Sequence, residues 1–94
     1  MSNRIVKLPS VESFGRLTPD KWLLLKTLEE AAEMVEAGKR LVKGDSTARP
    51  ELISEWADVV QTLANVATAF DITDLDIAQA MESCKQRNRM RGRL

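Results

Sequence analysis

PELISEWADVVQTLANVATAF, residues 50–70, is a long segment with no glycine, and its only proline is the first residue. Its apolar residues recur at intervals of three and four, which places them on one face of an α-helix. That face is formed by Leu52, Trp56, Val60, Leu63, Ala67 and Phe70. The segment therefore predicts an amphipathic helix that starts at Pro50 and Glu51 and buries one side.

A helix of similar length is predicted before this segment. Thr18-Pro19-Asp20 has the composition of a helix start, because Thr can cap, Pro suits the first helical position and Asp complements the positive helix end. The periodic pattern continues to about Val42, and Gly44 is suited to end it. The centre of this helix's apolar face is formed by Leu24, Leu28, Ala31, Val35 and Val42.

A third helix is predicted from Thr73, which can act as its cap, to roughly Arg89. Residues 1–17 show no sustained period and predict an N-terminal arm with one short helical turn around Val11–Phe14. No segment alternates long enough to predict a strand. We expect one all-α domain at 18–94, a bundle of three to four helices per protomer. A chain of 94 residues buries a modest core, so we expect self-association to a dimer or tetramer to complete the bundle.

Composition narrows the function classes. The chain has no His, which removes the commonest acid–base group at neutral pH and the commonest zinc ligand, so any catalysis has to use carboxylates, Lys, Arg or a metal ion. The single Cys84 excludes an internal disulfide and fits a reducing cytoplasm. No apolar run has the length of a membrane span, and the N-terminus lacks a signal-peptide core, so we expect a cytoplasmic protein without a membrane partner.

The net charge of zero argues against a nucleic-acid partner, although the charges are unevenly distributed. The last ten residues contain no acid. The basic residues of this C-terminal end are Lys85, Arg87, Arg89, Arg91 and Arg93.

Both long helices carry acids along one edge of the apolar face. On the second helix the edge consists of Glu51, Glu55, Asp58, Thr62 and Asn65, spaced so that each side chain lies above the next. On the first helix the edge consists of Lys26, Glu30, Glu33 and Ala37, while Glu29 and Glu36 lie farther round toward solvent.

Like charges at these intervals repel one another, and two such edges brought together repel more strongly. A divalent cation offsets this repulsion, and carboxylates from facing helices are suitable ligands for Mg²⁺, which in turn bridges phosphate oxygens. The competing interpretation is that these acids only face solvent, since Glu-x-x-Glu spacings are common on soluble helices.

Together the two acidic edges resemble the signature of the all-α MazG-like nucleoside triphosphate pyrophosphohydrolases, which is Glu-x-x-Glu, a variable spacer and Glu-x-x-Asp. Here the motifs read Lys26-x-x-Glu29-Glu30-x-x-Glu33 and then Glu55-x-x-Asp58. ISEWADVVQTLANVATAFDI resembles the family's second helix, and TDLDIAQAMESCKQRNRMRGRL resembles its last helix and basic end. The resemblance covers residues 20–93.

This resemblance implies hydrolysis of a nucleoside triphosphate, NTP or dNTP, to the monophosphate and pyrophosphate, as nucleotide pool control. It implies Mg²⁺, or Mn²⁺ in its place, as the cofactor. The metal ligands that it implies are Glu30, Glu33, Glu55 and Asp58. A ligand carboxylate such as Glu30, or Glu29 close by, would orient the attacking water or take its proton.

The resemblance also implies substrate-binding residues, and each has a structural alternative. Lys26 either contacts a phosphate or pairs with Glu30 one turn later. Asn65 either hydrogen-bonds a base or sugar or is a polar side chain at the helix rim. Lys85, Asn88 and Arg91 either close over the triphosphate or belong to a solvated basic tail.

Two other functions remain open. The related phosphoribosyl-ATP pyrophosphatases share the Lys-x-x-Glu-Glu start but usually carry a His shortly after the second motif, where this chain has Val59-Val60-Gln61-Thr62. A non-catalytic helical interaction module with a basic tail is the alternative from a different class.

Overall fold

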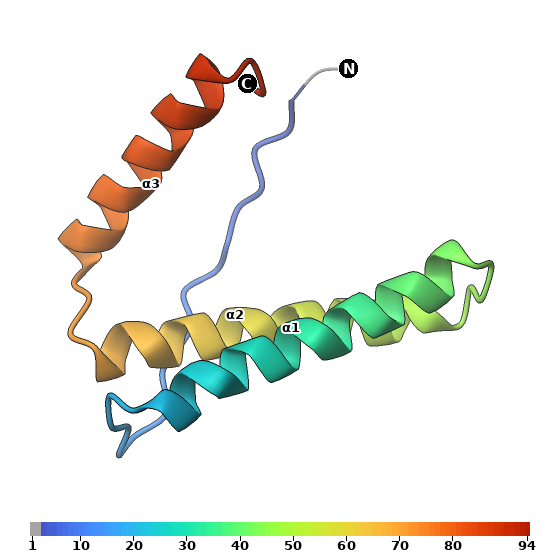
Figure 1. Cartoon of the computed structure of the whole chain (residues 1–94), viewed down its shortest axis with the longest axis horizontal. Coiled ribbons are helices and arrows are strands. Elements are labelled where there is room, and N and C mark those ends of the chain that lie inside the picture. The colour runs from blue at the N-terminus through green and yellow to red at the C-terminus, as the bar shows by residue number, and fades with distance from the viewer. Residues whose placement is uncertain (1–2) are drawn as a thin grey trace. The chain divides into compact units, whose positions relative to one another are not determined.

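The computed structural model describes residues 3–94, and their regular structure is entirely α-helical (Figure 1). The three helices are α1 (Lys21–Val42), α2 (Ala48–Ala69) and α3 (Asp74–Met90). No strand occurs in the described range, so the predicted all-α class is confirmed. None of these helices is both long enough and apolar enough to cross a membrane.

The chain divides into two compact units, which are described separately. Val11–Asp71 form the first unit, which holds α1 and α2. The second contains the chain before Val11, of which residues 3–10 are described, together with Ile72–Leu94 and thus α3.

Asp20 is the cap of α1. Its carboxylate accepts from the Leu23 N–H at 2.9 Å and from the Thr18 hydroxyl at 2.6 Å. These bonds, the one from Thr18 foremost, lower the pKa of Asp20. The predicted start with Thr18 as cap and Pro19 as first helical residue is therefore wrong, because Asp20 takes the capping role and Thr18 supports it. The helix ends as predicted, with Gly44 in the left-handed region at φ 105°.

Helix α2 begins at Ala48, two residues before the predicted start at Pro50. The preceding turn is organised by Asp45, whose carboxylate accepts from the Thr47 N–H at 3.1 Å and from the Thr47 hydroxyl. Pro50 is the third helical residue, where the N–H that proline lacks has no partner within the helix. Proline therefore does not have to be the first residue.

Helices α1 and α2 run antiparallel and side by side (Figure 1). Small residues lie where they meet. Ala37 and Ala48 are buried, and a Cβ added to Gly38 would lie 3.6 Å from Leu52 Cδ1. Small side chains let two helix backbones approach closely. Among the described residues no large apolar side chain of this unit is fully buried, although Leu23, Met34 and Leu52 are half-buried.

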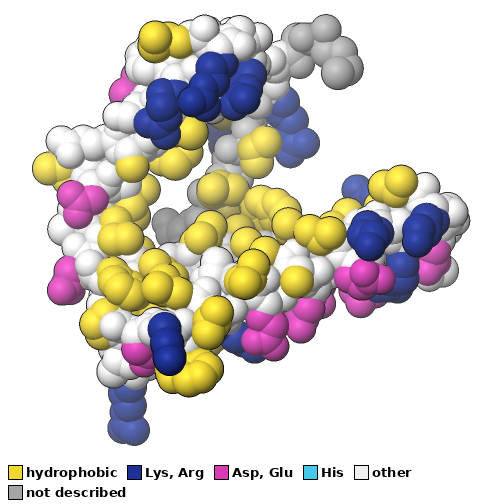
Figure 2. Space-filling view, in the orientation of Figure 1, with side chains coloured by type: hydrophobic (Ala, Val, Ile, Leu, Met, Phe, Trp, Pro, Cys, Tyr) yellow, Lys and Arg dark blue, Asp and Glu magenta, His cyan; other side chains and the backbone are white. Residues whose placement is uncertain are grey.

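The larger apolar residues of both helices are exposed. Leu28 is 67% exposed and Leu63 55%, although both belong to the predicted buried faces. Trp56 also remains accessible to solvent. Figure 2 shows hydrophobic side chains exposed along the helix pair, with acidic side chains beside them. The predicted apolar faces are thus only partly covered within the protomer, because Leu52 and Val60 are half-buried while Leu28 and Leu63 remain exposed.

The segment Glu12–Phe14 has no regular secondary structure and lies along α2, so the predicted helical turn around Val11–Phe14 is wrong. The backbone groups of the arm bond to α2 side chains instead of to each other. Gln61 Nε2 donates to the Glu12 carbonyl at 3.0 Å, and the Phe14 N–H donates to Asn65 Oδ1 at 3.0 Å. The hydroxyls of Thr68 and Ser13 are 2.7 Å apart. Side chains of α2 therefore hold the arm in place.

Thr73 caps α3 as predicted, and a reciprocal bond between the Thr73 N–H and the Asp76 carboxylate completes a capping box. No residue of α3 is buried. The basic end of the chain is visible in Figure 2 as dark blue side chains near the last turns of α3.

Candidate functional site

Three carboxylates converge between α1 and α2. Glu30 comes from α1, and Glu55 and Asp58 come from neighbouring positions on one edge of α2. One oxygen from each lies within 4.8 Å of the other two. We call these three residues the acidic cluster. The structure thus brings together three of the four carboxylates that the sequence suggested as metal ligands.

One oxygen of the cluster has no partner. Glu55 Oε2 is buried and accepts no hydrogen bond from the described part of the chain. A buried carboxylate oxygen is expensive to leave unpaired, and a divalent cation would satisfy it. Two oxygens on opposite sides of one Mg²⁺ are about 4.2 Å apart, because each bond is about 2.1 Å long. The separations in the cluster are thus of the size that one such ion spans.

Glu33 lies beside the acidic cluster without belonging to it. The Glu30 carboxylate raises the pKa of Glu33 above its usual value, and desolvation and the Glu55 carboxylate raise it further. Glu33 is one helical turn from Glu30 on α1. The structure therefore brings the fourth suggested ligand into the electrostatic reach of the cluster.

Lys26 is the nearest cation. Its Nζ lies 3.3 Å from Glu30 and 3.5 Å from Glu29, and both carboxylates, Glu30 foremost, raise the pKa of Lys26. The predicted ion pair of Lys26 with Glu30 is present. The same ammonium group lines the cleft beside the cluster, so the predicted contact with a phosphate stays a prediction. Glu29 is mostly exposed and has Lys26 as its ion-pair partner.

A cleft of about 210 Å³ adjoins the acidic cluster. Its walls carry acids, a base, amides and one aromatic ring. The lining residues are Phe14, Lys26, Glu30, Asp58, Gln61, Thr62 and Asn65. Phe14 and Gln61 had not been suggested by the sequence, because their position depends on the arm lying along α2. The sequence signals that pointed to this cleft were the two helix edges, one with Lys26 and Glu30 and the other running from Asp58 to Asn65.

Asn65 is almost fully buried, with 5% of its surface exposed. Its Oδ1 accepts from the Phe14 N–H and, at 3.2 Å, from Gln61 Nε2. Thr62, also buried, donates to the Val59 carbonyl one turn earlier at 2.7 Å and so satisfies itself within α2. Asn65 therefore fastens the arm while its side chain lines the cleft.

The three C-terminal candidates lie in the second unit. Asn88 Oδ1 accepts from Arg93 at 3.3 Å, and Asn88 Nδ2 lies 3.6 Å from Cys84 Sγ. Lys85 and Arg91 are exposed. Their predicted contact with a triphosphate stays a prediction.

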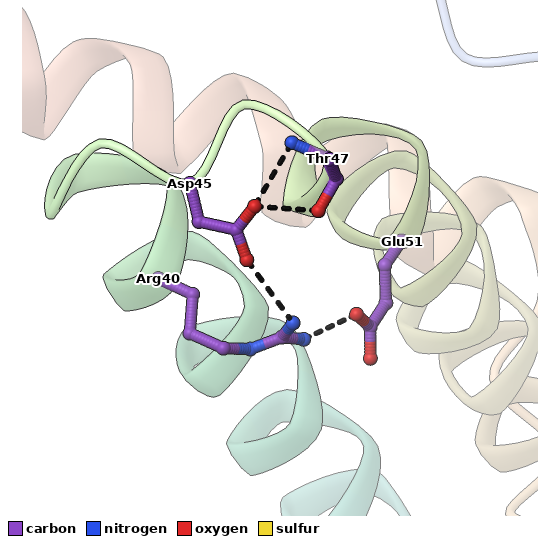
Figure 3. Close-up of polar contacts among 4 residues, drawn as sticks. All are labelled: Arg40, Asp45, Thr47 and Glu51. Atoms are coloured by element: carbon purple, nitrogen blue, oxygen red, sulfur yellow. Dashed lines mark hydrogen bonds and ion pairs between the residues drawn. The ribbon is translucent and has the colours of Figure 1, made fainter.

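A second polar contact joins the loop ends of α1 and α2 (Figure 3). Arg40 donates to the Glu51 carboxylate and lies 3.9 Å from Asp45. The hydrogen bond that Arg40 donates to Glu51 raises the pKa of the Arg40 guanidinium. We call Arg40, Asp45 and Glu51 the arginine clamp. Glu51, the first acid of the α2 edge, is thus neutralised by an arginine and stands apart from the acidic cluster.

Comparison of the chain with models of protein families, with curated proteins and with solved structures finds no match.

Proposed function

We propose that this protein is a Mg²⁺-dependent hydrolase that cleaves a nucleoside triphosphate between the α and β phosphates, releasing the monophosphate and pyrophosphate. The observation that carries the proposal is the acidic cluster, in which carboxylates from two helices meet and one buried oxygen lacks a partner. Clustered carboxylates that border an open cleft are suited to hold a divalent cation against a phosphate chain.

Each residue of the site has a chemical role in this proposal. Glu30, Glu55 and Asp58 hold the metal ion, with Glu33 as a fourth carboxylate within reach. When bound, Mg²⁺, or Mn²⁺ in its place, supplies charge neutralisation of the phosphates and an acidified water. Lys26 gives up part of its pairing with Glu30 and Glu29 to contact a phosphate oxygen, which leaves either carboxylate able to accept the proton of the attacking water.

A nucleotide panel tests the proposal. The full chain is incubated with Mg²⁺ and with each of the eight common NTPs and dNTPs, and the monophosphate and pyrophosphate are quantified. We expect turnover of at least one nucleotide and none without the metal. Folded protein that turns over no nucleotide with Mg²⁺ or Mn²⁺ would favour the non-catalytic interaction module instead.

We also propose that a second copy of this chain covers the exposed apolar face of the helix pair. Among the described residues only Ala37 and Ala48 are buried apolar side chains, which is too small a core for an independent domain. The uncovered residues include Leu24, Leu28, Val35, Trp56 and Leu63. A helix pair with one uncovered apolar face is half of a four-helix bundle, and an identical pair is a complementary partner for it.

Sedimentation measurements test this association. Leu63→Glu introduces a charge into the exposed apolar face, and we expect it to shift the protein from dimer or tetramer to monomer. Ile5→Glu, at an exposed position outside the helix pair, is the matched control and keeps the oligomer. A wild-type chain that is monomeric at micromolar concentration would refute the proposal.

A further inference from the structure

The arm supplies an aromatic surface to the cleft. We propose that Phe14 and Asn65 recognise the base of the nucleotide, Phe14 by stacking on it and Asn65 by donating a hydrogen bond to its edge. This inference rests on the proposed function, since it divides one cleft into a part for the base and a part for the phosphates. Neither the acidic motifs nor the helix pattern points to Phe14.

The backbone that carries Phe14 is held in place, although the residue itself is exposed. Hydrogen bonds from Gln61 and Thr68 fix the two preceding residues, and Asn65 holds the Phe14 backbone itself. The ring nevertheless keeps 60% of its surface exposed and lines the cleft. An accessible aromatic ring on a held backbone beside a polar cleft is the kind of surface on which nucleobases stack, because every base offers a flat π face.

The orientation of the Asn65 amide follows from its partners. A backbone N–H can only donate, so the Phe14 N–H requires the amide oxygen on the side of the arm. Gln61 Nε2 donates to the same oxygen, which fixes the same orientation. No hydrogen bond donated by the Asn65 NH₂ group is found among residues 3–94, and Asn65 Nδ2 is not one of the buried atoms that lack a partner. The group therefore keeps access to the cleft that Asn65 lines, where an acceptor can reach it.

The chemistry of a nucleobase matches both features. Each base has a flat face for Phe14 and carbonyl oxygens or ring nitrogens that accept from an amide N–H. The cleft volume of about 210 Å³ is smaller than the roughly 300–1,000 Å³ of pockets that enclose a whole drug-sized ligand. The cleft therefore takes the base as a part of the nucleotide. Glu30 and Asp58 on the same cleft mark where its phosphates meet the metal.

Isothermal titration with Mg²⁺ present separates the base from the phosphates. The probes are the non-hydrolysable α,β-methylene analogues of ATP, GTP, CTP and UTP, with inorganic triphosphate as the ligand that lacks a base. We expect Phe14→Ala to weaken the best-bound analogue by roughly 5- to 150-fold and to leave inorganic triphosphate unchanged. Phe14→Trp should keep the affinity for the analogue, because it keeps a flat ring.

Two further variants complete the experiment. Trp22→Ala removes an exposed aromatic side chain that does not line the cleft, and should change neither affinity. Asn65→Asp keeps an acceptor for the Phe14 N–H but removes the NH₂ donor. Asn65→Asp should therefore weaken binding of the analogue more than binding of inorganic triphosphate. The ratio of the two affinities is compared because the added negative charge repels the phosphates of both ligands.

The outcomes distinguish this inference from the proposed function. If Phe14→Ala weakens the analogue and inorganic triphosphate equally, or weakens neither, then the arm is only structural and the base assignment is wrong. If wild-type protein binds inorganic triphosphate in a Mg²⁺-dependent way but binds no analogue more tightly, the phosphate site stands and the base site falls. If it binds none of the probes, both fall.

Discussion

Helices α1 and α2 meet at two polar contacts that both contain carboxylates but differ in whether the negative charge is balanced within the chain. In the arginine clamp, Arg40 lies between the carboxylates of Glu51 and Asp45 and neutralises them (Figure 3). In the acidic cluster, three carboxylates face each other, and Lys26 reaches only Glu30 among them. The first contact carries its counter-ion within the chain, and the second leaves negative charge and a buried oxygen unbalanced.

This difference separates a structural contact from a candidate site. Residues selected only to hold two helices together would be expected to pair opposite charges, as the clamp does. Like charges held close together destabilise the fold until a ligand compensates them, and such unbalanced groups gather at functional sites. Matched substitutions at the two contacts test this interpretation directly.

The largest effect on kcat/KM is expected when one acid at each contact is replaced by its uncharged amide. Asp58→Asn removes a metal ligand and should lower kcat/KM for the best nucleotide by at least about 100-fold, because metal activation supplies several kcal/mol. Glu51→Gln removes an acid of the same helix edge and should leave kcat/KM within about twofold. Steady-state kinetics on both variants gives the comparison. Equal losses would erase the distinction between the two contacts.

The next effect is the response of thermal stability to the metal. Mg²⁺ at ten times its dissociation constant should raise the Tm of the wild-type protein by about 6–11 °C, since it binds only the folded chain. Glu55→Gln should abolish most of this rise while raising the Tm of the metal-free protein, because it removes a buried charge. Scanning calorimetry at constant ionic strength measures both. A rise of the same size in Glu55→Gln would place the ion elsewhere.

A smaller effect is expected at the arginine clamp. Arg40→Met keeps an unbranched aliphatic stem but leaves Glu51 and Asp45 without their cation, and should lower the Tm by about 2–6 °C at low salt. The loss should shrink in 1 M NaCl, because salt screens exposed ion pairs. Arg49→Met, at an exposed arginine without an ion pair among the described residues, is the control. The Mg²⁺ response should persist in both variants.

The smallest effect concerns Glu33 and pH. Its pKa is raised in the folded chain, so the folded state holds this proton more tightly than the unfolded state does. Repulsion by Glu30 therefore lowers stability above the raised pKa, and the loss is recovered as the pH falls toward the ordinary value of 4.5.

Glu33→Gln should accordingly raise the Tm of the metal-free protein at neutral pH by about 1–3 °C, with no gain below about pH 4.5. Glu36→Gln should give no such gain, because Glu36 pairs with Lys39 at 4.0 Å. Thermal melts of both variants from pH 4 to pH 8 provide the test. A gain in Glu33→Gln that grows toward acid pH would contradict the assigned repulsion.

The sequence predicted the helices better than it predicted how they pack. Local signals sufficed for α3, where Thr73 and Asp76 satisfy each other's backbone groups within one turn. They also indicated that Glu30, Glu55 and Asp58 border apolar faces. The helical spacing placed Leu28 and Leu63 on the predicted buried faces, yet both are exposed in the protomer. A helical wheel identifies an apolar side but not which partner, in the same chain or another, will cover it.

The cleft was the least predictable part. Most of its lining was suggested by the helix edges, but Phe14 lies in a segment without any period. The lining residues that belong to those edges are Lys26, Glu30, Asp58, Thr62 and Asn65. Its position depends on a hydrogen bond between residues 51 positions apart in the chain. No local pattern encodes such a contact, because a single amide on α2 recruits a backbone N–H of the arm.

The same long-range hydrogen bond sets an order of assembly. The α1–α2 hairpin closes over a short loop, whereas docking Phe14 on Asn65 closes a far longer segment and loses more chain entropy. We therefore expect the hairpin to form first and the arm to dock afterwards. The side of the cleft that Phe14 lines is then the last part of this unit to fold. The Phe14 amide proton, protected only once that step is complete, would report on it in a hydrogen-exchange measurement.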